Sequence, residues 1–134
     1  HERGGLLCED YTERNTLQYL TESSCISCGD EHNQLVDEAY LTQLIRLRQI
    51  GLFKIEDIQD HRLVHQIYRY KDKYFSERRV RFLVEWDPTS LLQIEEEDAC
   101  LPLHYASFHS TIQGFRFAFE LGIRYYPIKK GISL

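Results

Sequence analysis

The sequence predicts an all-α solenoid of about three helix-turn-helix repeats, and two observations favour it. Three related segments occur along the chain, and they begin at Asp10, Asp57 and Glu96. Each is expected to hold two helices, the second of which ends at a stop signal: Gly51, Asp87-Pro88 and Gly122. Glycine suits the left-handed residue just after a helix, and the residue before proline avoids helical backbone angles.

The clearest segment runs from Glu96 to Gly122. Its motif residues are Leu101-Pro102-Leu103-His104-Tyr105-Ala106, then Phe115, Ala118, Phe119 and Gly122. This order resembles the ankyrin repeat, whose pattern reads D-x-x-G-x-T-P-L-H-x-A and then V-x-x-L-L-x-x-G. With Glu96 at the opening position, Pro102 and Gly122 fall in register without a gap. The long, divergent copies are similar to the expanded ankyrin-like proteins of some microalgae.

Two weaker copies precede this segment. In the second copy, Val64, His65 and Ile67 align with the L, H and A positions, and the second helix carries Val80, Leu83 and Val84. In the first copy, Leu17 and Leu20 align, and the second helix carries Leu44 and Leu47. The extra residues of this copy, around Ser23 to Gln34, are rich in Ser, Gly, Asp and Asn and are expected to form a loop.

The 134 residues are expected to form a single ankyrin-like repeat domain, with repeats at about 10–52, 57–88 and 96–123. Because Met is absent and an apolar last helix has no successor, we expect a fragment with a further repeat missing after 134. The C-terminal edge would then be covered by the tail, by further sequence, or by self-association with a second copy. The stride of 47 and then 39 residues departs from the family's 33, so a generic array of helical hairpins is the structural alternative.

The repeat alignment predicts which side chains form the core. They are Leu103, Ala106, Phe119, Leu83, Val84, Leu44 and Leu17. In ankyrin repeats the histidine of the motif ties neighbouring turns by hydrogen bonds. The resemblance therefore implies structural roles for His65 and His104, and no catalytic residue is predicted.

The resemblance implies non-catalytic binding of a protein partner on a concave surface of inner helices. In the ankyrin pattern, the exposed inner positions are the residue between H and A and the third and fourth residues after it. Interface-type side chains occupy several of these positions, and the predicted partner-binding residues are Tyr19, Arg69, Tyr70, Tyr105 and Phe108. The alternative is that the aromatic rings lap over the neighbouring repeat as part of the core.

A second hypothesis concerns the C-x-x-C pair Cys25 and Cys28, which is followed by His32. A tetrahedral metal site needs four donors, usually from two such pairs, and only one pair is present. We therefore predict no metal and no cofactor, and keep a small thiol or zinc-binding protein acting through Cys25 and Cys28 as the alternative function.

Composition excludes several other classes. A net charge of −5 is unfavourable for nucleic-acid binding, although basic and aromatic residues alternate between Arg62 and Arg81. No apolar run is long enough to cross a membrane. Four cysteines are too few for a disulfide scaffold, which favours an intracellular location, cytoplasmic or nuclear.

Overall fold

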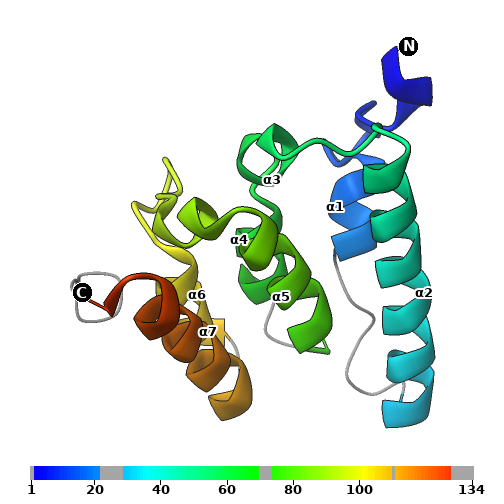
Figure 1. Cartoon of the computed structure of the whole chain (residues 1–134). Coiled ribbons are helices and arrows are strands. Elements are labelled where there is room, and N and C mark those ends of the chain that lie inside the picture. Colours follow the sequence, from blue (N-terminus) through cyan, green and yellow to red (C-terminus); the bar gives the residue numbers. More distant parts are fainter. Residues whose placement is uncertain (1, 22–28, 70–73, 110, 128–134) are drawn as a thin grey trace.

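The computed structural model describes residues 2–21, 29–69, 74–109 and 111–127, and all regular secondary structure in these ranges is helical (Figure 1). The elements are η1 (Glu2–Gly5), α1 (Thr16–Thr21), α2 (Asp30–Gln49), α3 (Glu56–Asp60), α4 (Leu63–Arg69), α5 (Glu77–Trp86), η3 (Pro88–Leu92), α6 (Pro102–His109) and α7 (Ile112–Tyr125). The predicted all-α fold class is therefore confirmed. None of these helices is both long and apolar enough to cross a membrane.

Six of the helices form three pairs that stand side by side (Figure 1). Helix α1 packs against α2, α4 against α5, and α6 against α7. Neighbouring pairs meet through their first helices, because α4 contacts both α1 and α6, and α2 also contacts α5. We call α1, α4 and α6 the inner helices. The pairs fall close to the predicted ranges 10–52, 57–88 and 96–123, and their assignment to ankyrin-like repeats remains a prediction.

Two of the three predicted stop signals end a helix as expected. Helix α2 is followed by Gly51, which has a φ of 82° and donates its N–H to the Arg48 carbonyl at 3.1 Å. Helix α5 ends before Asp87. The third prediction is wrong, because Gly122 is buried inside α7, which continues to Tyr125. Tyr125 packs against the core, so tertiary contact extends the helix past the glycine.

The predicted loop from Ser23 to Gln34 is wrong in its second half. Helix α2 already begins at Asp30, so the helix covers the last five residues of that loop. Asp30 and Glu31 place negative charge in the first turn, where it favours the positive end of the helix dipole. Asn33 is buried, which shows that the added turn packs against the rest of the protein.

The core contains six of the seven predicted side chains. Leu17, Leu44, Leu83, Val84, Leu103 and Ala106 are all buried. Phe119 was predicted to join them but is 38% exposed, because it lies outside the buried side of α7, which consists of Gly114, Phe117, Ala118, Leu121 and Gly122. The repeat alignment therefore identifies the buried face of every helix pair except at the last helix.

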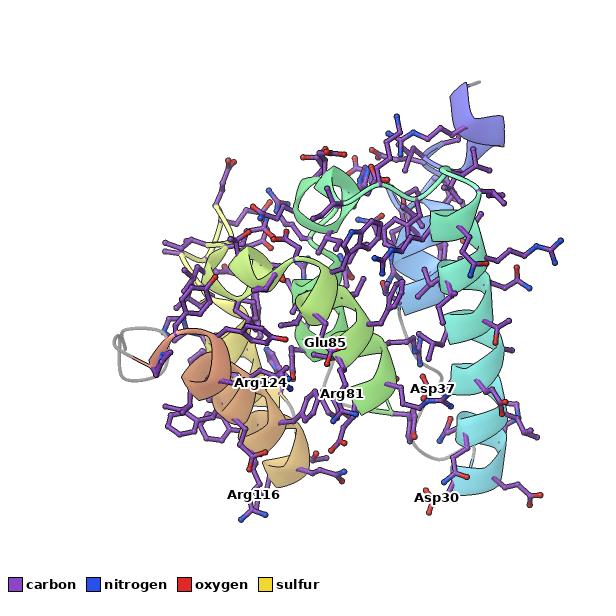
Figure 2. All side chains as sticks on the ribbon, in the orientation of Figure 1. Asp30, Asp37, Arg81, Glu85, Arg116 and Arg124 are labelled. Atoms are coloured by element: carbon purple, nitrogen blue, oxygen red, sulfur yellow. The ribbon has the colours of Figure 1, made fainter. Side chains whose placement is uncertain are left out.

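A buried ion pair joins the first two helix pairs. Arg79 of α5 is fully buried, and its Nε donates to Asp37 Oδ1 of α2 at 2.7 Å. The same guanidinium donates to the Leu20 carbonyl at the end of α1 at 3.0 Å. Ser76 donates its hydroxyl to Asp37 and accepts the Arg79 backbone N–H, so it also caps α5. Figure 2 shows Asp37 on α2, on the side that faces α5.

The histidine of the second copy links two helix pairs, as the resemblance implies. His65 Nε2 donates to the Cys100 carbonyl, just before α6, at 3.2 Å. His104 instead accepts the Leu101 N–H within its own turn, at 2.9 Å. The expected link between neighbouring units is therefore present for His65, whereas His104 bonds only within its own turn.

We expect His65 to make the fold weaker in mild acid. Burial lowers the pKa of its imidazole below the ordinary 6.5, because the charged form is poorly solvated inside the protein. The unfolded chain then binds a proton that the folded chain resists, so the free energy of unfolding falls as the pH drops below about 6.5. Urea unfolding of wild type, His65→Gln and the exposed control His32→Gln at pH 7.5 and 5.5 measures this loss.

The loss on acidification should be smaller in His65→Gln than in wild type and unchanged in His32→Gln. Equal losses in all three proteins would show that His65 contributes nothing to the pH dependence.

Candidate functional site

A polar pocket of about 330 Å³ lies where the loop before α1, helix α4 and the loop before α6 meet. Its lining is mostly charged or amide side chains, namely Thr12, Glu13, Arg14, Gln18, Arg62, Gln66, Arg69, Glu95 and Glu97. Three arginines and three glutamates share this lining, so the pocket offers both signs of charge within a small space. We refer to this site below as the polar pocket.

One wall of the polar pocket is a loop organised by Asp10. The Asp10 carboxylate accepts the Thr12 backbone N–H at 2.8 Å and also accepts the Thr12 and Tyr19 hydroxyls. The Thr12 hydroxyl bond, followed by that of Tyr19, lowers the pKa of Asp10 to about 2. The Arg14 guanidinium lies over the Tyr19 ring, 4.8 Å from its centroid. Tyr19, a predicted binding residue, is thus held beside the pocket by Asp10 and Arg14.

The opposite wall is the loop that precedes α6. Glu95 is buried, and its Oε1 forms an ion pair with Arg62 Nη1 at 3.1 Å. The loop closes on itself, since the Glu95 N–H donates to the Cys100 carbonyl at 2.9 Å and the Ala99 N–H donates to the Glu95 carbonyl at 2.8 Å. The acidic run that begins at Glu95 is therefore anchored at its first residue, while residues 96–98 are exposed.

Arg69 is the predicted binding residue that lines the polar pocket. It lies at the end of α4, is half-buried, and forms no ion pair or hydrogen bond with the residues that the structure describes. Arg62, in contrast, is already paired with Glu95. Within the described lining, Arg69 is thus a cation whose hydrogen-bond donors are available to an external carboxylate or similar group.

The remaining predicted residues divide between surface and core. Phe108 of α6 is 66% exposed, whereas Tyr105 of the same helix is only 4% exposed. The Tyr105 hydroxyl donates to Asp98 at 2.9 Å, and its ring meets the His65 ring edge to face at 5.7 Å. Tyr105 therefore belongs to the core, as the alternative interpretation of the aromatic residues states. Tyr70 lies outside the described residues.

Sequence analysis missed the two loops that form the walls of the polar pocket. The signal at Asp10 was available, because Asp followed two residues later by Thr favours a turn in which the carboxylate accepts a backbone N–H. The burial of Glu95 had no such signal, since four adjacent acidic residues usually mark a solvated loop.

The thiol pair of the alternative function, Cys25 and Cys28, lies outside the described residues. In the part of the chain that the structure describes, no group of three metal-binding side chains occurs. Cys8 is exposed and Cys100 is half-buried, and neither is in a disulfide.

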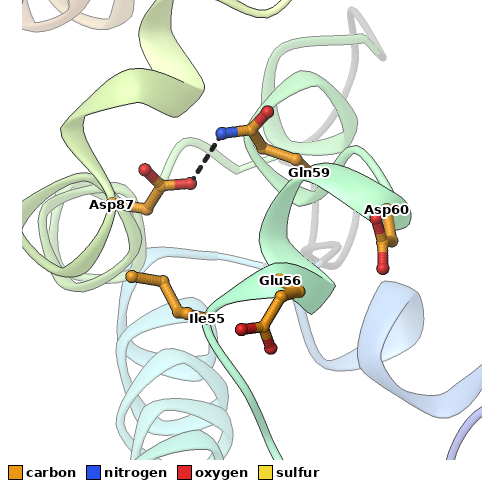
Figure 3. A pocket seen from close by; sticks show the side chains of 5 residues that line it. All are labelled: Ile55, Glu56, Gln59, Asp60 and Asp87. Carbon is orange, nitrogen blue, oxygen red and sulfur yellow. Dashed lines mark hydrogen bonds between the residues drawn. The ribbon is translucent and has the colours of Figure 1, made fainter.

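A second, acidic cavity of about 350 Å³ lies between α3 and the end of α5 (Figure 3). It is lined by Ile55, Glu56, Gln59, Asp60 and Asp87. Gln59 Nε2 donates to Asp87 Oδ2 at 2.9 Å, and Asp87 also accepts the Thr89 backbone N–H at 3.2 Å. These bonds join α3 to the α5–η3 junction, so the central polar groups of this cavity serve the fold.

Comparison with protein-family models, with curated proteins and with solved structures gives no match to this chain.

Proposed function

We propose that the chain is a non-catalytic protein-binding module, built as an ankyrin-like solenoid, that binds its partner along the inner helices. The observation that carries the proposal is that Tyr19, Arg69 and Phe108 offer accessible surface from α1, α4 and α6, three successive inner helices. Tyrosine, arginine and phenylalanine are residue types enriched at protein interfaces. An intracellular location is part of the same proposal.

The surface also indicates the chemistry of the partner. Arg69 offers charged hydrogen-bond donors at the polar pocket, which suits a carboxylate. Phe108 offers an apolar ring one helix further along. Packed helices lie about 8–10 Å apart, and an extended chain advances about 3.3 Å per residue. A partner segment that reaches both residues would therefore carry an acidic and an apolar side chain roughly three residues apart.

The proposal predicts that Arg69→Glu combined with Phe108→Ser abolishes partner binding without unfolding the protein. A photo-crosslinking amino acid at position 19 would capture the partner in cells, and the double variant would reduce the crosslinked product at least tenfold. Both substituted side chains are partly or largely exposed, so the free energy of unfolding should change by only about 0.5 kcal/mol per site.

The matched control is Arg46→Glu with Leu35→Ser, which makes the same types of change on α2 at two exposed positions. Equal crosslinking in the control and in the inner-helix variant would contradict the proposed surface. The zinc content of the purified chain distinguishes the alternative function, because stoichiometric zinc would support a site at Cys25 and Cys28.

A further inference from the structure

Helix α7 carries two groups of apolar side chains. One side is buried against the rest of the protein and consists of Gly114, Phe117, Ala118, Leu121 and Gly122. The other side carries Ile112, Phe115, Phe119 and Ile123, which we call the outer stripe. Ile112 is 87% exposed, Phe119 and Ile123 are about 40% exposed, and Phe115 is half-buried.

The outer stripe is one continuous surface. Its residues are separated by three or four positions, a spacing that places them along one side of a helix. The rings of Phe115 and Phe119 stack with their centroids 6.3 Å apart. A hollow of about 290 Å³ opens beside the stripe, lined in part by Ile112 and Phe115. Contiguous exposed apolar surface of this kind marks an interaction site, unlike single exposed apolar residues.

Two opposite charges accompany the outer stripe on one flank. Arg116 and Glu120 are four positions apart, both are exposed, and neither forms an ion pair with the described residues. Arg116 points away from the other helices in Figure 2. On a helix of 3.6 residues per turn, both side chains fall on the same side of the line that joins Ile112 to Ile123.

The residues of the outer stripe and the two charged residues are arranged in pairs about nearly the same point of α7. The midpoint of Phe115 and Phe119 is position 117, that of Arg116 and Glu120 is position 118, and that of Ile112 and Ile123 lies between these two positions. A twofold axis at this point would place α7 antiparallel to α7 of a second copy. Ile112 would then face Ile123 of that copy beside the hollow, and Arg116 would face Glu120 on both sides of the axis. We infer that the outer stripe is a self-complementary dimer interface of this antiparallel kind.

The positions of Arg116 and Glu120 favour antiparallel packing of the two α7 helices. They also favour a second copy of this chain as the molecule that covers the outer stripe. In a twofold dimer with parallel helices, the charged flank of one copy would face the Phe115 flank of the other, and the two charges would not meet. In the antiparallel dimer the same flanks meet, so each Arg116 gains a Glu120. This inference is independent of the proposed partner surface, which uses the inner helices.

Charge reversal tests the inference by sedimentation equilibrium of the whole chain across a range of concentrations. Arg116→Glu places two acids opposite each other, and Glu120→Arg places two arginines opposite each other. Each variant alone should dimerise at least tenfold more weakly than wild type. An equimolar mixture should form a mixed dimer, because every acid of one chain then faces an arginine of the other. The double variant R116E/E120R should dimerise like wild type.

Two controls complete the test. Glu38→Arg and Arg46→Glu reverse exposed charges on α2, outside the stripe, and should leave dimerisation unchanged. Phe119→Ser should weaken dimerisation, and mixing this variant with either charge variant should not restore it. A wild type that stays monomeric at all concentrations would overturn the inference and assign the stripe to another occupant. The inference would also be overturned if the single charge reversals left dimerisation unchanged, or if the equimolar mixture of the two variants failed to restore it.

Discussion

Replacing Asp37 with alanine should reduce the free energy of unfolding by about 3–5 kcal/mol, the range expected when one partner of a buried ion pair is removed. Arg79 is fully buried, so its guanidinium would lose the Asp37 carboxylate without gaining water. Burial lowers the pKa of Arg79 even with Asp37 beside it, because the charged guanidinium is poorly solvated inside the protein. Ser76 would also lose the carboxylate to which it donates.

Urea unfolding followed by far-ultraviolet circular dichroism measures this effect. Glu38→Ala is the matched control, because it removes the neighbouring carboxylate from the exposed side of the same helix and should cost at most about 0.5 kcal/mol. The difference between the two variants should persist at high salt, since buried pairs are screened much less than exposed ones. A loss for Asp37→Ala no larger than that of Glu38→Ala would show that Arg79 finds another anion or reaches water.

Truncating Leu83 or Leu44 to alanine should cost about 2–5 kcal/mol. Both side chains are completely buried in the core, on α5 and α2 respectively. The cost combines the lost burial of the side chain with the cavity left behind, and its size depends on how far the neighbouring residues can close that cavity. Leu103→Ala on α6 should fall in the same range, because Leu103 is also buried.

The matched control is Leu35→Ala, which makes the same substitution on α2 at a position that is 64% exposed. Because Leu35 and Leu44 share one helix, the change in helix propensity is similar at both and their difference reports burial. Thermal or urea unfolding of the four variants should therefore separate Leu35→Ala from the other three. Equal losses at Leu35 and Leu44 would contradict the packing of α2 described above.

Local rules explain what could be predicted from the sequence. Gly51 and Asp87-Pro88 end helices through backbone sterics, and Pro102 begins one because its missing N–H costs nothing in a first turn. Glycine at position 122 also favours the end of a helix, but α7 continues through it because Tyr125 packs against the core. Phe119 fits the apolar pattern of a core residue, and only the arrangement of the helices shows which side of α7 is covered.

Less of the candidate site than of the fold could be predicted from the sequence. Arg69 and Phe108 could be named because the spacing of the repeat motif places them on the inner helices. The polar pocket also depends on Asp10 and Glu95, which reach it through loops whose paths follow from tertiary packing. The pairing of Asp37 with Arg79 joins residues 42 positions apart and leaves no trace in local periodicity.

The buried bond between Asp37 and Arg79 also makes the first two helix pairs chemically specific for each other. When the junctions of a helical array are purely apolar, units can be exchanged, duplicated or removed with little chemical penalty at the new junction. Here the first pair presents a buried carboxylate and the second pair supplies the matching guanidinium. Deleting the second pair, or moving the first pair elsewhere, would bury Asp37 without Arg79. A rearrangement of the helix pairs is therefore expected to keep the fold stable only where it retains both Asp37 and Arg79.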